Sequence, residues 1–299
     1  MDQLQDFIRR GVSRRKFLAG VGCSGTAAAL TLAGCGGNSS SSTTPTSPTT
    51  PALTDTDILN FALNLEYLEA EFYLRATTGS GLSATDAGAN AGTVTGGGQV
   101  PFATPAIQQY AMEIANDELL HVRFLRNALG SAAVSRPEID LTNSFNAAAM
   151  AAGIGSAFNP FASEDDFVVG AFTFEDVGVT AYHGAAGLLT NTTNLGAAAG
   201  IMATEAYHAA EIRTLLAQLG GNYLTYANQI SALRATAGGG NEVAVAGNAI
   251  VPADSNSIAF DRTTDQVLHI VYLSAAAGVV KSGGFFPAGL NGTITATTN

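Results

Sequence analysis

ELLH at residues 118–121 and EAYH at residues 205–208 share one pattern, Glu-x-x-His. Each tetrapeptide lies in a long segment rich in alanine and leucine, which predicts a helix. Residues three apart lie on one face of a helix, so each glutamate–histidine pair can bind one metal ion. A single pair of this kind is a weak signal, and its repetition in one chain makes metal binding the favoured interpretation.

A glutamate precedes each tetrapeptide on another predicted helix. Glu66 lies seven residues before Tyr73, and Glu175 lies seven residues before Tyr182. Seven residues are close to two helical turns, so each glutamate shares a helix face with its tyrosine. Two glutamate helices and two Glu-x-x-His helices form the ligand pattern of four-helix di-iron and di-manganese proteins.

The two Glu-x-x-His helices also repeat each other around these ligands. Isoleucine, glutamate, histidine and arginine recur at the same internal spacing, as Ile114, Glu118, His121 and Arg126 and as Ile201, Glu205, His208 and Arg213. This repetition predicts two copies of a helical hairpin that pack around one metal centre. The predicted ligands are Glu66, Glu118, His121, Glu175, Glu205 and His208.

The repeat selects Glu66 over its neighbours Glu69 and Glu71, which align with Gly178 and Thr180. Glu69 is the first substitute if Glu66 is not the ligand. Glu113 is interpreted as solvated or beside the site.

The other candidate residues receive ordinary structural interpretations. His183 and His269 lack the Glu-x-x-His spacing, and we interpret both as structural, with His183 a candidate neighbour of the site. Tyr73 and Tyr182 are expected to be packed aromatics with a hydrogen-bonding hydroxyl, which near a redox metal could also pass electrons or protons. Arg126 and Arg213 are interpreted as charges near helix C-termini.

The N-terminus predicts export. SRRKFL at residues 13–18 is a twin-arginine signal, and the apolar run behind it is too short and glycine-rich to span a membrane. The run ends in LAGC at residues 32–35, which resembles a lipoprotein cleavage box. Residues 1–35 are therefore predicted to be a signal with Cys35 as the lipid anchor, ordinary cleavage nearby being the alternative. Residues 36–53 are rich in Ser, Thr and Pro and predict a disordered linker.

Composition limits the partners and the type of metal site. The net charge is −11, with 13 basic and 24 acidic residues, which argues against nucleic acid. The chain has 2 cysteines, Cys23 and Cys35, so the predicted domain at residues 54–299 has no disulfide and no thiolate ligand. We expect localisation at the periplasmic side of the cell envelope, with the membrane as a partner through the lipid.

The helices that would carry this site are expected at residues 55–76, 104–130, from 163 onward, and 194–219. Two further helices are expected at residues 223–234 and 264–277. Residues 77–101 and the crossover at 131–162 are expected to be irregular, and no main element shows a strand pattern.

The segment at residues 63–73, the two Glu-x-x-His tetrapeptides, and the tail segments GGFFP (283–287) and GLNG (289–292) resemble the ferritin-like superfamily. They are similar, more narrowly, to exported bacterial ferritin-like domain proteins related to plant desiccation-associated proteins. Over about residues 54–292, this resemblance implies an all-α, up-down four-helix bundle with a long crossover and additional C-terminal helices. It also implies a dinuclear iron or manganese site, with Glu118 and Glu205 bridging, Glu66 and Glu175 as terminal ligands, and one histidine on each metal.

Two functions follow as expectations. The first is an oxygen- or peroxide-reactive di-metal protein in stress protection, with ferroxidase, peroxidase and catalase-like chemistry left open. The alternative is a non-enzymatic envelope protein that acts during drying or other stress, with a structural or absent metal. Without rubredoxin-type cysteines, any electron donor must be external. Assembly into a homo-oligomer is left open, whereas a closed iron-storage cage fits poorly with a membrane tether.

Overall fold

The computed structural model describes residues 52–239, 241–246, 249–275 and 278–298, which belong to one compact unit, Pro51–Asn299. The predicted signal at residues 1–35, with Cys35, lies outside the described residues. The predicted linker at residues 36–53 also lies outside the described residues, except for its last two residues, which are exposed and irregular.

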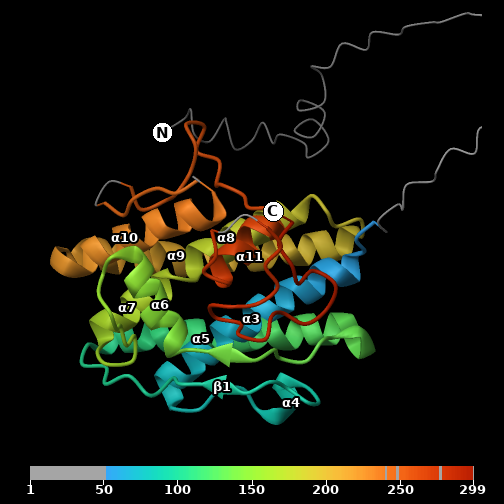
Figure 1. Ribbon diagram of the computed structural model, residues 1–299, viewed down its shortest axis with the longest axis horizontal. Helices are drawn as coiled ribbons and strands as arrows, with labels where there is room; N and C mark the ends of the chain where they lie inside the picture. The colour runs from blue at the N-terminus through green and yellow to red at the C-terminus, as the bar shows by residue number, and fades with distance from the viewer. Residues whose placement is uncertain (1–51, 240, 247–248, 276–277, 299) are drawn as a thin grey trace, which may run out of the picture. The chain divides into compact units, whose positions relative to one another are not determined.

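Four long helices form two hairpins and confirm the all-α fold. In the first hairpin, α3 (Asp55–Thr78) packs along α5 (Pro105–Leu129). In the second, α8 (Glu175–Ala186) packs along α9 (Thr192–Leu219). Figure 1 shows α3 and α5 side by side in blue and green. No described helix is both long and apolar enough to cross a membrane.

The first helix begins at the predicted residue and ends two residues beyond the predicted 76. Thr54 and Asp57 form a capping box, in which each side chain accepts a hydrogen bond from the backbone N–H of the other residue. The helix ends at Gly79, whose φ of 77° is a left-handed conformation that favours glycine. These fixed ends set the register of the helix that carries Glu66.

The third predicted helix is in fact two helices, α7 (Glu164–Phe172) and α8. The backbone N–H of Phe174 donates to the carbonyl of Ala171 at 3.0 Å, three residues back, so the chain tightens at this point. Glu175 therefore stands in the first turn of α8. The positive end of a helix dipole favours a carboxylate there.

The crossover between the hairpins is more ordered than the sequence indicated. It contains the short 3-10 turn η1 (Gly130–Ala132) and the helix α6 (Asn143–Ala152). It also supplies β2 (Ile139–Asp140), which pairs in parallel with β1 (Val94–Thr95) from the connection between α3 and α5. That connection also contains α4 (Ala84–Ala87). Strands of two residues are too short to show an alternating pattern.

Two C-terminal helices lie outside the four-helix core, as predicted. The first, α10 (Gly221–Gly238), packs against α6, α7 and α9, and is longer than the expected 223–234. The second, α11 (Thr264–Val271), packs against α8 and α10. Its predicted extent of 264–277 was too long, because the backbone turns at Leu273, where φ is 53°. Figure 1 shows α10 in orange beside α9.

Arg213 corrects one prediction. It was interpreted as a charge near a helix C-terminus, but it lies before the last turn of α9 and is fully buried, with its guanidinium 2.9 Å from Asp176 Oδ2. Arg234 of α10 binds the same oxygen at 2.8 Å. The guanidinium of Arg213 also donates to carbonyls of the segment between α10 and α11, at Val243, Ala249 and Ile250. These bonds join the C-terminal region to α8 and α9.

Candidate metal centre

Both hairpins contribute acidic and imidazole side chains to one buried point between them. The first hairpin contributes Glu66 from α3, and Glu118 and His121 from α5. The second contributes Glu175 from α8, and Glu205 and His208 from α9. The four glutamates are 0% exposed, and the two histidines are at most 9% exposed. All six residues singled out in the sequence therefore converge.

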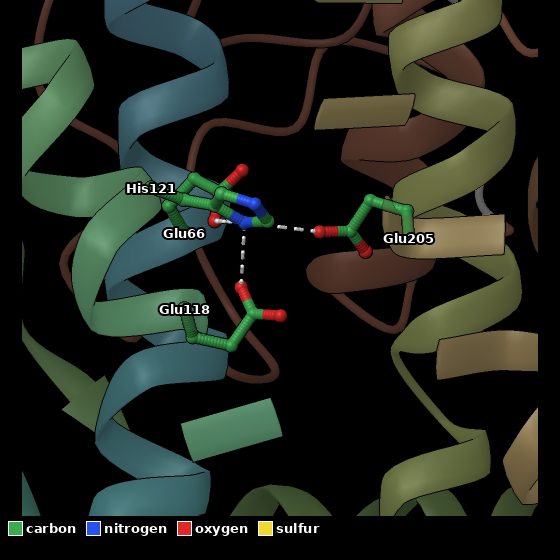
Figure 2. A group of neighbouring side chains, drawn as sticks. All are labelled: Glu66, Glu118, His121 and Glu205. Atoms are coloured by element: carbon green, nitrogen blue, oxygen red, sulfur yellow. Dashed lines mark hydrogen bonds and ion pairs between the residues drawn. The ribbon is translucent and has the colours of Figure 1, made fainter. Parts of the chain in front are cut away.

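One group consists of Glu66, Glu118, His121 and Glu205, with one ligand atom from each lying within 4.8 Å of all the others. Figure 2 shows the ring nitrogen of His121 facing the three carboxylates. His121 Nδ1 lies 3.2 Å from Glu66 Oε2, and 3.4 Å from both Glu118 Oε2 and Glu205 Oε1. Three helices, α3, α5 and α9, supply this group.

The second group consists of Glu118, Glu175, Glu205 and His208, and one ligand atom from each again lies within 4.8 Å of all the others. His208 Nδ1 lies 3.0 Å from Glu118 Oε1 and 3.5 Å from Glu175 Oε2. The two histidine rings are 6.4 Å apart between centroids. Glu118 and Glu205 belong to both groups, so the two candidate metal positions share these carboxylates.

Two tyrosines hold the outer glutamates, and each crosses to the other hairpin. Tyr73 of α3 donates its hydroxyl hydrogen to Glu175 Oε1, and Tyr182 of α8 donates to Glu66 Oε1. Each bond occupies one carboxylate oxygen and leaves the second oxygen turned toward the neighbouring histidine. The tyrosines were expected to carry hydrogen-bonding hydroxyls, but the exchange between hairpins was not indicated by the sequence.

The carboxylate oxygens that face the centre have the histidine rings as close neighbours but no hydrogen bond of good geometry. Within the described residues, no hydrogen bond reaches Glu66 Oε2, Glu118 Oε1, Glu175 Oε2 or either carboxylate oxygen of Glu205. Buried polar atoms are nearly always paired, and an unpaired buried charge is costly. A set of buried oxygens and imidazole nitrogens around two points fits two metal cations, which would neutralise the charge and use the free acceptor atoms.

The pKa values show how strongly the carboxylates interact without a metal. Burial raises the pKa of Glu66 to about 7 and raises the pKa of Glu205 well above its usual value. Burial acts in the same direction on Glu118. Its contacts with both histidines nevertheless hold the pKa of its carboxyl below the usual range.

Burial acts on the two histidines in the opposite sense. Burial lowers the pKa of a histidine, but the surrounding carboxylates outweigh it and raise the pKa of both His121 and His208, the latter to about 12. Without metal, protons therefore supply the positive charge that the carboxylates require. Metal ions would take the place of these protons.

The remaining acidic candidates lie outside the two groups. Glu71 is buried in ion pairs with Arg75 and Arg136. Glu113 is exposed and lines an open cleft beside His208. Glu69 is buried beside the centre but belongs to neither group.

The other histidines are also separate from the centre. The ring of His183 lies 3.1 Å from the carbonyl of Phe260, and the ring of His269 lies 2.6 Å from the carbonyl of Ser274. Both contacts agree with the structural interpretation of these residues.

Asp117 is the neighbour of the site that the sequence did not single out. Its Oδ2 lies 3.3 Å from His208 Nε2, on the side of the ring away from the glutamates. A carboxylate in this position orients a metal-binding histidine and raises its basicity. The residue stands next to Glu118 in the sequence, but no spacing rule distinguishes it from other surface aspartates.

Comparison with known proteins places this geometry in a family. The model of the ferritin-like domain family matches residues 54–218, which span all four helices of the site. The chain is 30% identical to the desiccation-related protein PCC13-62 of Craterostigma plantagineum, over 72% of this chain and 76% of that protein. It is 28% identical to the ferritin-like catalase Nec2 of Nesocodon mauritianus, over 80% of this chain and 84% of that protein. The chain belongs to the ferritin-like domain family.

Proposed function

We propose that the chain binds two iron or manganese ions and disproportionates hydrogen peroxide. The observation that carries this proposal is the pair of overlapping ligand groups with shared Glu118 and Glu205. In our assignment both metals would be held by these two glutamates. Glu66 and His121 would complete the ligands of one metal, and Glu175 and His208 those of the other.

The donor set favours metals that change oxidation state. Carboxylate and imidazole ligands suit iron and manganese, and adjacent metal ions can share the electrons of one peroxide molecule. The site has no described thiolate, because both cysteines of the chain precede residue 36. Iron and manganese are both consistent with this donor set.

Of the three candidate reactions, disproportionation of peroxide is the one that needs no external electron donor. Two molecules of hydrogen peroxide give two of water and one of dioxygen, so one peroxide is oxidised while the other is reduced. The relative named as a ferritin-like catalase supports this choice over peroxidase or ferroxidase chemistry. Those reactions need an added reductant or ferrous iron as a substrate.

The protein's own residues would position the ligands and manage protons. Tyr73 and Tyr182 fix the outer glutamates through their hydroxyls. Asp117 fixes the ring of His208. The burial of all six ligands excludes bulk water, which strengthens every charge interaction inside the site.

A non-enzymatic role is the second candidate, and the relative named as a desiccation-related protein favours it. In that case the metals would only stabilise the bundle, and the domain would protect the envelope during drying. The intact ligand set is compatible with this role as well as with catalysis.

We further propose that the chain is exported by the twin-arginine route and anchored to the membrane through lipidated Cys35. The supporting motifs are SRRKFL at residues 13–18 and LAGC at residues 32–35. The twin-arginine route carries folded proteins, which suits a centre that is loaded with metal before export.

Oxygen release separates these functions. Metal-loaded protein is given hydrogen peroxide alone, and peroxide and dissolved oxygen are followed together. Disproportionation predicts one dioxygen for every two peroxides consumed. Peroxide loss that occurs only after a reductant is added, without dioxygen, would indicate a peroxidase. No loss of peroxide with or without the reductant, at full metal occupancy, would favour the structural role. His121→Ala with His208→Ala is the control for adventitious metal.

A further inference from the structure

A small cavity lies on the side of α3 and α8 that faces the C-terminal helices. Its volume is about 40 Å³, and its walls come from α3, α6, α8, α10 and α11, with Phe285 from the C-terminal tail. The side chains around it are almost all apolar, including Leu65, Leu68, Val177 and Ile270. The cavity is separate from the cleft that Asp117 and His208 line.

Two charged residues reach the cavity wall. The guanidinium of Arg234 is already occupied, because it binds Asp176 and Glu242. Glu69 differs: it is 5% exposed, and no hydrogen bond or ion pair to another described residue involves its carboxyl. The cavity therefore has one unpartnered buried polar side chain.

Gly178 separates this cavity from the candidate metal centre. The residue lines the cavity, and a Cβ atom built on it would lie 2.3 Å from Glu205 Oε2 and 3.4 Å from Glu69 Oε1. Any other residue would therefore push against the shared carboxylate of Glu205. Close packing of α8 on α9 explains why residue 178 is a glycine. This packing does not explain the apolar cavity behind Gly178 or the unpartnered carboxyl of Glu69 in the cavity wall.

The lining determines what this cavity can hold. A buried water requires about two to four hydrogen-bond partners, whereas one carboxyl group is free here. Cavities lined by apolar side chains stay dry and take up xenon or other apolar molecules, and apart from Glu69, Thr173 and Arg234 the side chains that line this cavity are apolar. The volume of about 40 Å³ suits a molecule of very few atoms.

The cleft beside His208 has the contrasting character. Tyr110, Glu113, Asp117 and Glu211 line it, and the Asp117 side chain is 30% exposed. Peroxide is polar and forms hydrogen bonds, so this cleft suits its approach. Dioxygen is apolar and forms only weak hydrogen bonds, so it suits the apolar cavity.

We propose that the apolar cavity behind Gly178 is a dioxygen site, which receives the gas formed at the metal pair, while peroxide arrives through the cleft beside Asp117. The gas assignment rests on the proposed disproportionation. The preference of the cavity for a small apolar molecule rests on its lining and volume alone.

Xenon tests the cavity without requiring turnover. Crystals of the full, metal-loaded chain are pressurised with xenon, and a xenon peak is expected among Leu68, Val177 and Ile270. The absence of xenon from the cavity, or hydrogen-bonded water filling it, would overturn the proposal. This result stands independently of whether the protein consumes peroxide, so it is distinguishable from a failure of the proposed function.

Filling the cavity tests its role in the reaction. Ala148 of α6 lines the cavity, whereas its neighbour Ala147 is exposed. Ala148→Leu is expected to remove the xenon peak and to lower oxygen release at saturating peroxide severalfold, with metal content unchanged. Ala147→Leu is the matched control and should change neither quantity. Unchanged oxygen release from a folded, xenon-free Ala148→Leu protein would overturn the assignment as a dioxygen site.

Discussion

Tyr73 of the first hairpin donates a hydrogen bond to Glu175 of the second, and this bond ties a candidate ligand to the helix hairpin opposite its own. Tyr182 and Glu66 form the reciprocal bond. The two hairpins are thus joined by the same carboxylates that face the metal positions. The packing of the two hairpins therefore also brings the candidate ligands together.

Tyr73→Phe should destabilise the protein and weaken the half of the site that contains His208. A hydrogen bond to a buried charged group contributes about 1.5–3 kcal/mol, and we expect a loss of unfolding free energy in that range. Denaturant unfolding and metal content of the same sample would measure both effects. Tyr182→Phe should act on the His121 half. Wild-type stability and metal content in both variants would show that the crossed bonds have no role.

Glu66→Ala and Glu69→Ala should differ in their effect on the centre. Glu66 belongs to a ligand group, and Glu69 belongs to none. The first change removes a ligand and is expected to reduce the metal content from about two ions to about one. The second should leave metal content nearly unchanged. If Glu69→Ala empties the site while Glu66→Ala does not, the inferred register of α3 around the metal is wrong.

Metal binding should release protons, and the apparent affinity should rise with pH. His208 has a pKa raised to about 12 and Glu66 one raised to about 7, so the metal-free native protein binds more protons than the unfolded chain near neutral pH. The stability that these two groups contribute therefore falls as the pH rises from about 4.5 through the folded pKa of Glu66 at about 7, and falls further toward that of His208. Because metal displaces these protons, calorimetry in two buffers of different ionisation enthalpy should show proton release. Binding that takes up protons, or is independent of pH, would exclude these groups as ligands.

Export should depend on the arginine pair, and membrane retention on the cysteine. Arg14→Lys with Arg15→Lys is expected to leave the precursor in the cytoplasm. Cys35→Ser is expected to prevent lipid labelling without blocking export. Cell fractionation and metabolic labelling with a fatty acid would follow each step. Normal lipid labelling of the Cys35→Ser protein would exclude Cys35 as the anchor.

The ligand helices were predictable because their signals are local. Glu118 with His121 and Glu205 with His208 are three residues apart, and the capping box of Thr54 lies at the start of its helix. These patterns involve neighbours in sequence, where helical geometry alone fixes the relative positions of the side chains. The convergence of all six candidate ligands follows from packing two such hairpins together.

Other features depend on partners distant in sequence. The buried position of Arg213 requires Asp176 and carbonyls near residue 250. The break before Glu175 occurs at Thr173 and Phe174, which are not strong helix breakers. The crossed tyrosine bonds depend on how the hairpins dock, and the apolar cavity depends on helices added after the four-helix core.

Metal content of the exported protein tests the central claim most directly. Protein purified from its native compartment should carry two transition-metal ions per chain by elemental analysis. His121→Ala with His208→Ala should lose most of this metal while its circular dichroism keeps much of the helix content. Two ions per chain in the wild type and a severe loss in the variant are the predicted result. Unchanged metal stoichiometry in the double variant would contradict the account.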